Sequence, residues 1–92
     1  MNKYHFRILV SRFLYNNIGS CKSFRTQGAL ADFLSVRQAT VSSWINRDSC
    51  IDAFTFFRIC QAFSLQGKKD VKQVFSEFLD VYRDFVQENY KS

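Results

Sequence analysis

The stretch from Thr26 to Arg47 constrains the fold of this chain more than any other feature of the sequence. It carries two short amphipathic helical periods that are separated at Ser35 by almost no linker. Two helices joined by about three residues must cross steeply, and the crossing requires a small side chain where they touch. Ala31 stands at the place expected for that contact, and Val36 is positioned to fill the turn. The sequence therefore predicts two crossed helices in this stretch.

The rest of the chain is also predicted to be helical. It contains no proline and only three glycines, which favours long helices over a turn-rich sheet. Thr26, Asp52 and Asp70 each precede an apolar helical period and can cap a helix N-terminus. The predicted helices cover about residues 2–17, 26–34, 37–46, 53–63 and 71–89. In the fourth of them, burial is expected for some of Phe54, Phe57, Cys60 and Phe63. An all-α fold of five helices is the prediction.

Length and composition limit the chain to one modest hydrophobic core. It has 92 residues, of which 47% are hydrophobic and eleven are Phe, so disorder is not expected. No apolar run approaches the roughly 20 residues that span a bilayer. The opening segment is interrupted by Arg7 and Arg12 and has no small-residue cleavage site, so we do not interpret it as a signal peptide. A cytoplasmic protein without a membrane partner is the expectation.

The cysteine and histidine content does not favour metal binding or catalysis. Three widely spaced cysteines form no C-x-x-C pair, and His5 is the only histidine, so Cys and His alone cannot assemble a zinc site. Buried or idle thiols are the simpler interpretation. The sequence has no glycine-rich phosphate loop, no paired carboxylates and no Cys/His nucleophile spacing. No enzyme, cofactor, metal or small-molecule ligand is predicted.

The positive charge of the chain is confined to its first half. Residues 1–50 carry seven basic and two acidic side chains, whereas residues 51–92 carry six of each. The net charge of +5 therefore belongs entirely to the half that contains the two crossed helices. A polyanionic partner for that half is a natural inference. On charge alone, a basic surface that serves only solubility remains an equal alternative.

The second crossed helix presents a polar face that carries no acid. Its apolar residues Val41, Trp44 and Ile45 are expected to face inward. The remaining side chains are short or hydrogen-bonding, so this face can enter a DNA major groove without repulsion from phosphates. That outward face comprises Arg37, Gln38, Ala39, Ser42, Ser43 and Asn46.

The pattern resembles the helix-turn-helix of phage repressors of the lambda or CI type, within the wider Xre-like group. The likeness covers about residues 4–65, and the run "LADFLSVRQATVSSWINRDS" is especially similar to a CI-type domain. It rests on small, apolar and amide side chains at set places, namely Gln27, Leu30, Ala31, Leu34, Val36, Gln38, Val41 and Trp44. A helical bundle with a chance match is the alternative.

The resemblance implies a role for each matching position. Gln38 would read adenine through N6 and N7, and Gln27 would contact a phosphate and brace Gln38. Ala39 would meet a thymine methyl group. The implied base-reading residues are Gln38, Ala39, Ser42 and Ser43, and the implied phosphate or positioning residues are Gln27, Arg25, Lys22, Arg37, Asn46 and Arg47. For the two serines and Asn46, ordinary solvated helix surface is the alternative.

The sequence departs from the family's pattern at two places. The family's turn usually has Gly where this chain has Ser35, and a left-handed backbone there would cost a non-Gly residue roughly 1 kcal/mol. Either the turn differs slightly or the packing compensates for that cost. CI-type domains also often have Ile-Pro where this chain has Cys50 and Ile51, which leaves the entry to the fourth helix uncertain.

The last helix is the expected dimerisation element. We divide the chain into a DNA-binding part, residues 1–67, and an amphipathic helix within residues 68–92. A helix-turn-helix monomer reads few base pairs, so pairing on two half-sites supplies affinity and specificity. The expected contacts form one apolar stripe of Val71, Val74, Phe75, Phe78, Leu79, Tyr82, Phe85 and Val86. Part of this stripe could instead close the core, and core packing alone is the alternative.

The function expected from the sequence is sequence-specific binding of double-stranded operator DNA. A phage or prophage repressor that binds a palindromic operator as a homodimer fits the motif and the one-sided charge best. The alternative is an antitoxin-like or antirepressor-like module that grips a protein through the Phe-rich last helix. RNA binding is disfavoured because the aromatic residues fall mostly on helical stripes and not on an exposed stacking surface.

Overall fold

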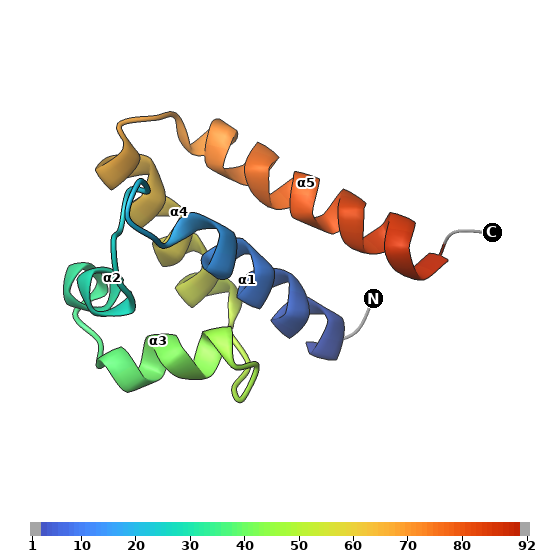
Figure 1. Ribbon diagram of the computed structural model, residues 1–92, viewed down its shortest axis with the longest axis horizontal. Helices are drawn as coiled ribbons and strands as arrows, with labels where there is room; N and C mark the ends of the chain where they lie inside the picture. The colour runs from blue at the N-terminus through green and yellow to red at the C-terminus, as the bar shows by residue number, and fades with distance from the viewer. Residues whose placement is uncertain (1–2, 91–92) are drawn as a thin grey trace.

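Five helices make up the computed structural model, which describes residues 3–90 (Figure 1). The helices are α1 (Lys3–Asn17), α2 (Gln27–Leu34), α3 (Gln38–Ile45), α4 (Ala53–Gly67) and α5 (Val71–Tyr90). The all-helical prediction is confirmed, and most boundaries agree with the sequence to within a residue or two. Helix α4 runs on to Gly67, past the expected end at Phe63. The expected start of the first helix at Asn2 lies outside the described residues.

The three expected helix caps are present. Thr26 Oγ1 accepts a hydrogen bond from the amide of Ala29 at 3.1 Å, at the start of α2. Asp52 Oδ1 accepts from the amide of Thr55 at 2.7 Å, at the start of α4. Ahead of α5, Asp70 Oδ1 accepts from the amide of Lys72 at 2.7 Å. In each case the side chain satisfies a backbone donor that the first turn of a helix leaves unpaired.

Helices α2, α3 and α4 end in the same way. Each is followed by a non-glycine residue with left-handed backbone: Ser35 (φ 58°), Arg47 (φ 66°) and Lys68 (φ 53°). The amide after that residue donates to a carbonyl five residues earlier, in the pairs Val36–Ala31, Asp48–Ser43 and Lys69–Ser64. This is the Schellman arrangement, in which glycine usually takes the left-handed position because a Cβ atom there is strained. Packing and hydrogen bonding therefore hold three such turns in this chain without glycine.

One hydrophobic core joins all five helices. Phe13 of α1 lies at its centre, with ring contacts to Phe63 of α4 and Phe78 of α5 at centroid separations of 5.4 and 5.8 Å. Phe24, from the polar link before α2, is also buried and packs against Phe63. Helix α5 contributes Val74, Phe78 and Phe85 to this cluster, so α5 shares the core of the other four helices.

As expected, α4 buries some of the four residues named in its apolar period. Cys60 and Phe63 are buried, but Phe54 and Phe57 have exposed fractions of 71% and 57%. Burial also raises the pKa of the Cys60 thiol to about 11. Cys21 and Cys50, by contrast, lie at the surface.

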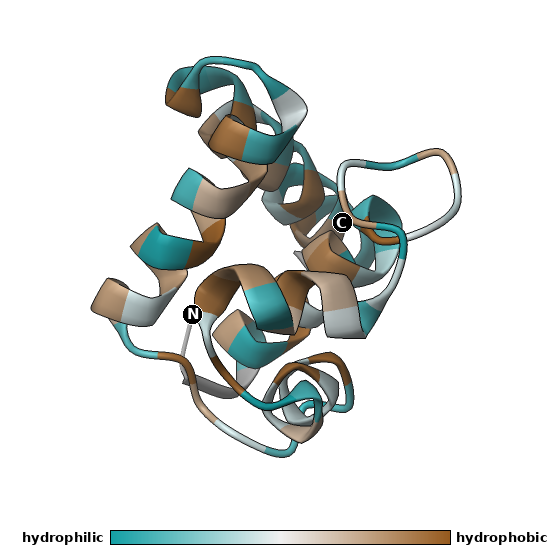
Figure 2. Ribbon diagram, turned by 90° about the vertical axis from the view of Figure 1, so that its left-hand side faces the viewer, coloured by the Kyte–Doolittle hydropathy of each residue, from teal (hydrophilic) through white to brown (hydrophobic). Residues whose placement is uncertain are grey.

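The two helices of greatest functional interest lie on opposite sides of the molecule. Figure 1 shows α3 along one side and α5 along the other, with α1 and α4 between them. Helix α3 packs on α1 and α2, and α5 packs on α1 and α4. Along the helices, hydrophobic and hydrophilic segments alternate, as expected for amphipathic helices that share a core (Figure 2). None of the helices in the described part of the chain is long and apolar enough to cross a membrane.

Candidate nucleic-acid interface

The α2–α3 pair has the tight turn that the sequence predicts. Ala31 is only 1% exposed on α2, which allows the close approach of the two helices. Ser35 takes the left-handed conformation (φ 58°, ψ 42°), so its strain is present and the surrounding packing compensates for it. The amide of Val36 then bonds the carbonyl of Ala31 at 2.9 Å and closes the turn. Arg58 of α4 donates to the carbonyl of Leu34 and ties the end of α2 to the body of the protein.

Helix α3 is anchored by its inner face. Val41 and Trp44 are buried, with exposed fractions of 0% and 6%. Ser11 of α1 donates a hydrogen bond of 2.5 Å to the carbonyl of Ile45 and fixes the end of the helix. Because Val41 and Trp44 hold the inner face of α3 against the core, the residues on the other side of the helix are directed outward. We call Gln38, Ala39, Ser42, Ser43 and Asn46 the readout face.

The start of the readout face is open to solvent. Gln38 and Ala39 are both exposed. A Cβ atom built on Gly28 would lie 3.4 Å from Gln38 Oε1, so the side chain of Gln38 rests on the backbone of α2. Arg37, at the N-cap, makes no side-chain cap bond to α3. The first amides of α3 are therefore available to an acceptor from outside, such as a phosphate.

The two serines are tied into the protein more closely than the sequence suggests. Ser42 Oγ donates to Gln27 Oε1 at 2.5 Å. Ser43 Oγ donates to the carbonyl of Thr40 at 2.7 Å and lies 2.9 Å from Ser49 Oγ. Gln27 thus braces Ser42, and not Gln38 as the family resemblance implies.

The basic residues around α3 carry uncompensated charge. Lys22, Arg25, Arg37 and Arg47 are all exposed, and within the described residues no carboxylate lies within ion-pair distance of any of them. Asn46, at the C-terminal end of α3, is exposed beside Arg47. The ion pairs of the described chain instead involve acidic residues of α5. Arg37 and Arg47, at the two ends of α3, therefore place uncompensated positive charge beside the readout face, whereas Lys22 neighbours Ser23, which approaches Gly67 at the end of α4.

The apolar stripe of α5 is divided between the core and the surface. Val74, Phe78 and Phe85 are buried with exposed fractions of at most 9%, so they cannot meet a partner in this fold. The other five residues are exposed or half-buried, and we call them the outer stripe: Val71, Phe75, Leu79, Tyr82 and Val86.

The outer stripe continues onto α4. The ring of Phe57 lies 6.1 Å from that of Phe75, edge to face. Phe54 lies three residues before Phe57 on the same exposed face of α4. Together the outer stripe and these two phenylalanines form an apolar surface. Such a group of exposed hydrophobic residues differs from the single, scattered ones that are normal on a protein surface.

Some contacts that position the interface were not found from the sequence. Phe24 lies in a link that is otherwise polar, and Arg58 lies on a helix with no obvious relation to the turn. Their burial and bonding depend on the packing of α4 against α2, for which no local pattern gives a signal.

Comparison with known proteins gives no match: no protein-family model, no curated protein and no solved structure matches this chain.

Proposed function

We propose that the protein is a sequence-specific regulator that binds double-stranded DNA through α3. The observation that carries this proposal is the readout face, a convex and acid-free surface that is anchored through its inner side and flanked by Arg37 and Arg47, neither of which has an ion pair within residues 3–90. A helix of this kind fits the major groove, where base edges are distinguishable, while the flanking cations neutralise phosphates.

The contacts of individual side chains follow from their surroundings. Gln38 is free to form two hydrogen bonds with adenine N6 and N7, and Ala39 can contact a thymine methyl group. Ser42 has already donated its hydroxyl hydrogen to Gln27, so its oxygen remains an acceptor. It would therefore favour a base that offers an amino group, such as adenine or cytosine.

The positioning contacts come from the rim of the readout face. Arg37, Asn46 and Arg47 approach the backbone on either side of α3. Arg25, next to the N-cap of α2, would extend this rim, and Lys22, in the link near the end of α4, would meet only DNA that reaches past α2. Gln27, through its bond to Ser42, positions a base-reading residue in addition to meeting a phosphate.

A second copy of the chain completes the proposed regulator. Helix α5 does not contact α3 and lies on the opposite side of the molecule from it, so pairing through the outer stripe leaves both readout faces accessible (Figure 1). To read a palindrome in successive major grooves, the pair would have to hold its two recognition helices about 34 Å apart on one face of the duplex. A repressor of the phage or prophage kind would act by occupying such an operator and excluding polymerase.

Salt dependence tests this proposal. We expect affinity for mixed-sequence duplex DNA to fall by about a thousandfold or more between roughly 50 and 200 mM salt, because several phosphate counterions are released on binding. The measurement is fluorescence anisotropy of a labelled duplex at several salt concentrations. Binding that is absent, or that does not weaken as salt rises, would contradict the proposal.

A protein-interaction module is the second proposal. The exposed side chains of Phe54, Phe57 and Leu79 favour it, because an apolar surface of this kind commonly meets another protein. An antitoxin-like or antirepressor-like adaptor would use this surface on a partner of different sequence. Isolation of the protein with a stoichiometric partner and no DNA would favour the module over the operator-binding dimer.

A further inference from the structure

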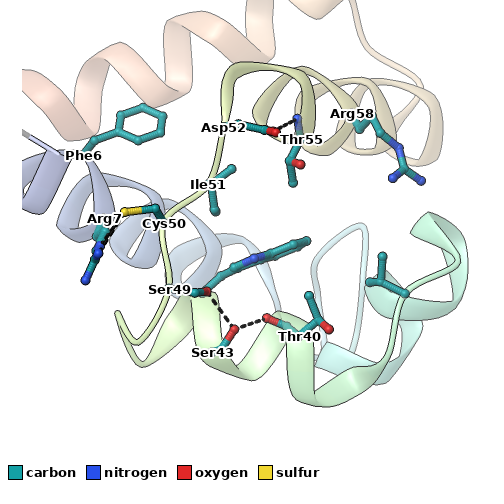
Figure 3. Close-up of a pocket in the computed structure, with 12 residues that line it drawn as sticks. Phe6, Arg7, Thr40, Ser43, Ser49, Cys50, Ile51, Asp52, Thr55 and Arg58 are labelled. Atoms are coloured by element: carbon teal, nitrogen blue, oxygen red, sulfur yellow. Dashed lines mark hydrogen bonds between the residues drawn. The ribbon is translucent and has the colours of Figure 1, made fainter.

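A groove of about 930 Å³ separates α3 from the beginning of α4 (Figure 3). The two helices are linked by residues 46–52 but do not pack on each other, because α3 rests on α1 and α2 while α4 rests on α2 and α5. Val36, Trp44 and Ile51 give the groove apolar walls. Its volume and lining fit the range of sites that hold small organic molecules, about 300–1,000 Å³.

Two guanidinium groups line this groove. In Figure 3, Arg7 lies at one end beside Cys50 and Arg58 lies toward the other, at α4. Arg58 uses one nitrogen to bond the carbonyl of Leu34, and Arg7 directs two nitrogens at Cys50 Sγ, at 2.8 and 3.1 Å. Within the described residues neither arginine has a carboxylate at ion-pair distance.

One carboxylate also lines the groove, but it is already engaged. Asp52 accepts the amide of Thr55 at the N-terminus of α4, and that backbone hydrogen bond lowers the pKa of Asp52. Its negative charge is thus partly balanced by the positive end of its own helix. The two arginines leave the groove with a positive excess, which is complementary to an acidic ligand.

We propose that this groove binds a flat, mainly apolar small molecule that carries one acidic group. The apolar body lies against Trp44 and Val36, and the acidic group pairs with Arg58 or Arg7. Trp44 and Ser43 belong to α3, so an occupant contacts the helix that the proposed function places in DNA. The site itself requires no DNA, and its test is made without DNA.

The test uses 1-naphthoate as the probe and 1-naphthylmethanol as its uncharged counterpart with the same rings. Each is titrated into ¹⁵N-labelled protein while amide shifts are followed by NMR. We expect naphthoate to shift the amides of Ser43, Ile51 and Thr55 and the indole of Trp44. It should bind at least about tenfold more tightly than the alcohol, as a charge-assisted hydrogen bond implies.

Two arginine variants locate the acidic group. Arg58→Gln keeps a donor for the carbonyl of Leu34 but removes the charge, and Arg7→Gln removes the charge at the other end. At least one of these two variants should bind naphthoate about tenfold more weakly than the wild-type protein. Arg83→Gln, at an exposed position of α5, should leave the affinity for naphthoate unchanged. Equal binding of the alcohol, shifts centred on Leu79 and Tyr82, or unchanged affinity in both variants would each overturn the proposal.

Discussion

The end of the molecule that carries α3 and the surface formed by α4 and α5 differ in almost every physical property. Around α3 the outward side chains are mostly short and hydrogen-bonding, and Arg37 and Arg47 have no carboxylate at ion-pair distance in the part of the chain that the structure describes. On α5 the acidic side chains Glu77, Asp80, Asp84 and Glu88 form ion pairs, and large apolar side chains of α4 and α5 such as Phe54 and Leu79 are exposed. The first region suits a charged polymer and the second suits an apolar partner. One small core thus carries two surfaces of different chemistry, which we propose bind separate partners.

The largest expected effect is on DNA affinity, and it depends on where positive charge is removed and not on how much is removed. Arg25→Gln with Arg37→Gln removes two positive charges beside the readout face, and Lys72→Gln with Arg83→Gln removes two from α5. We expect the first pair to weaken DNA binding by roughly 100-fold and to lower the salt slope by about 2, because each arginine neutralises one phosphate. The second pair of substitutions should leave the DNA affinity and the salt slope nearly unchanged. Equal losses in the two double variants, measured by anisotropy, would show that only net charge matters.

The apolar surface is tested by one substitution on the outer stripe. Leu79 is 60% exposed, so Leu79→Glu should leave the monomer folded while placing a charge in the proposed dimer contact. We expect the dissociation constant of the dimer, from sedimentation, to rise by at least about tenfold. Ser76→Glu, on an exposed polar position of the same helix, is the matched control. A dimer that tolerates Leu79→Glu as well as Ser76→Glu would place the contact elsewhere.

Deleting α5 would be a poorer test of dimerisation. Val74, Phe78 and Phe85 belong to the same core as α1 and α4, so the deletion should unfold the protein whether or not a dimer exists.

A smaller effect is expected at the turn between α2 and α3, where the left-handed backbone of Ser35 is strained. Ser35→Gly removes the Cβ atom from a left-handed position and should raise the free energy of unfolding by about 1 kcal/mol. Urea denaturation measures the change. Ser35→Ala, which keeps the Cβ atom, should give no such gain. Destabilisation by Ser35→Gly would mean that the Ser35 side chain stabilises the turn by more than its backbone strain.

The smallest effect concerns the cap of α4, which lies between the two surfaces. The backbone hydrogen bond from Thr55 lowers the pKa of Asp52 below its ordinary value of 3.8. A carboxyl whose pKa is lower in the folded state stabilises it above the unfolded pKa and ceases to do so as pH falls through the folded value. Asp52→Ala should therefore lower the melting temperature at pH 7, and the difference should shrink below about pH 4. Asp52→Asn can cap the helix but cannot ionise. The difference in melting temperature between Asp52→Asn and Asp52→Ala should therefore not change with pH.

The sequence predicts the helices well because helix periodicity and capping are local. The caps at Thr26, Asp52 and Asp70 and the turn at Ser35 were all expected from a few neighbouring residues. The packing of α5 was only partly predictable. Its apolar arc is wide enough for two neighbours, and the sequence cannot say which residues meet the core.

The site was predictable as a surface but not as a set of bonds. Exposure of Gln38 and the inward direction of Trp44 follow from helical spacing. The pairing of Gln27 with Ser42 depends on the crossing geometry of α2 and α3, which spacing alone does not determine. The residues that line the groove beside α3 come from α1, α3, α4 and the links between helices, so no contiguous sequence motif predicts the groove.

The central claim is that α3 reads base edges through Gln38. Selection of bound duplexes from a random pool tests it most directly, with the wild-type protein and Gln38→Ala compared side by side. We predict that the wild-type protein enriches a palindrome and that the variant loses preference at one base pair in each half-site. Selection of no common sequence, or the same full palindrome from both proteins, would contradict the claim.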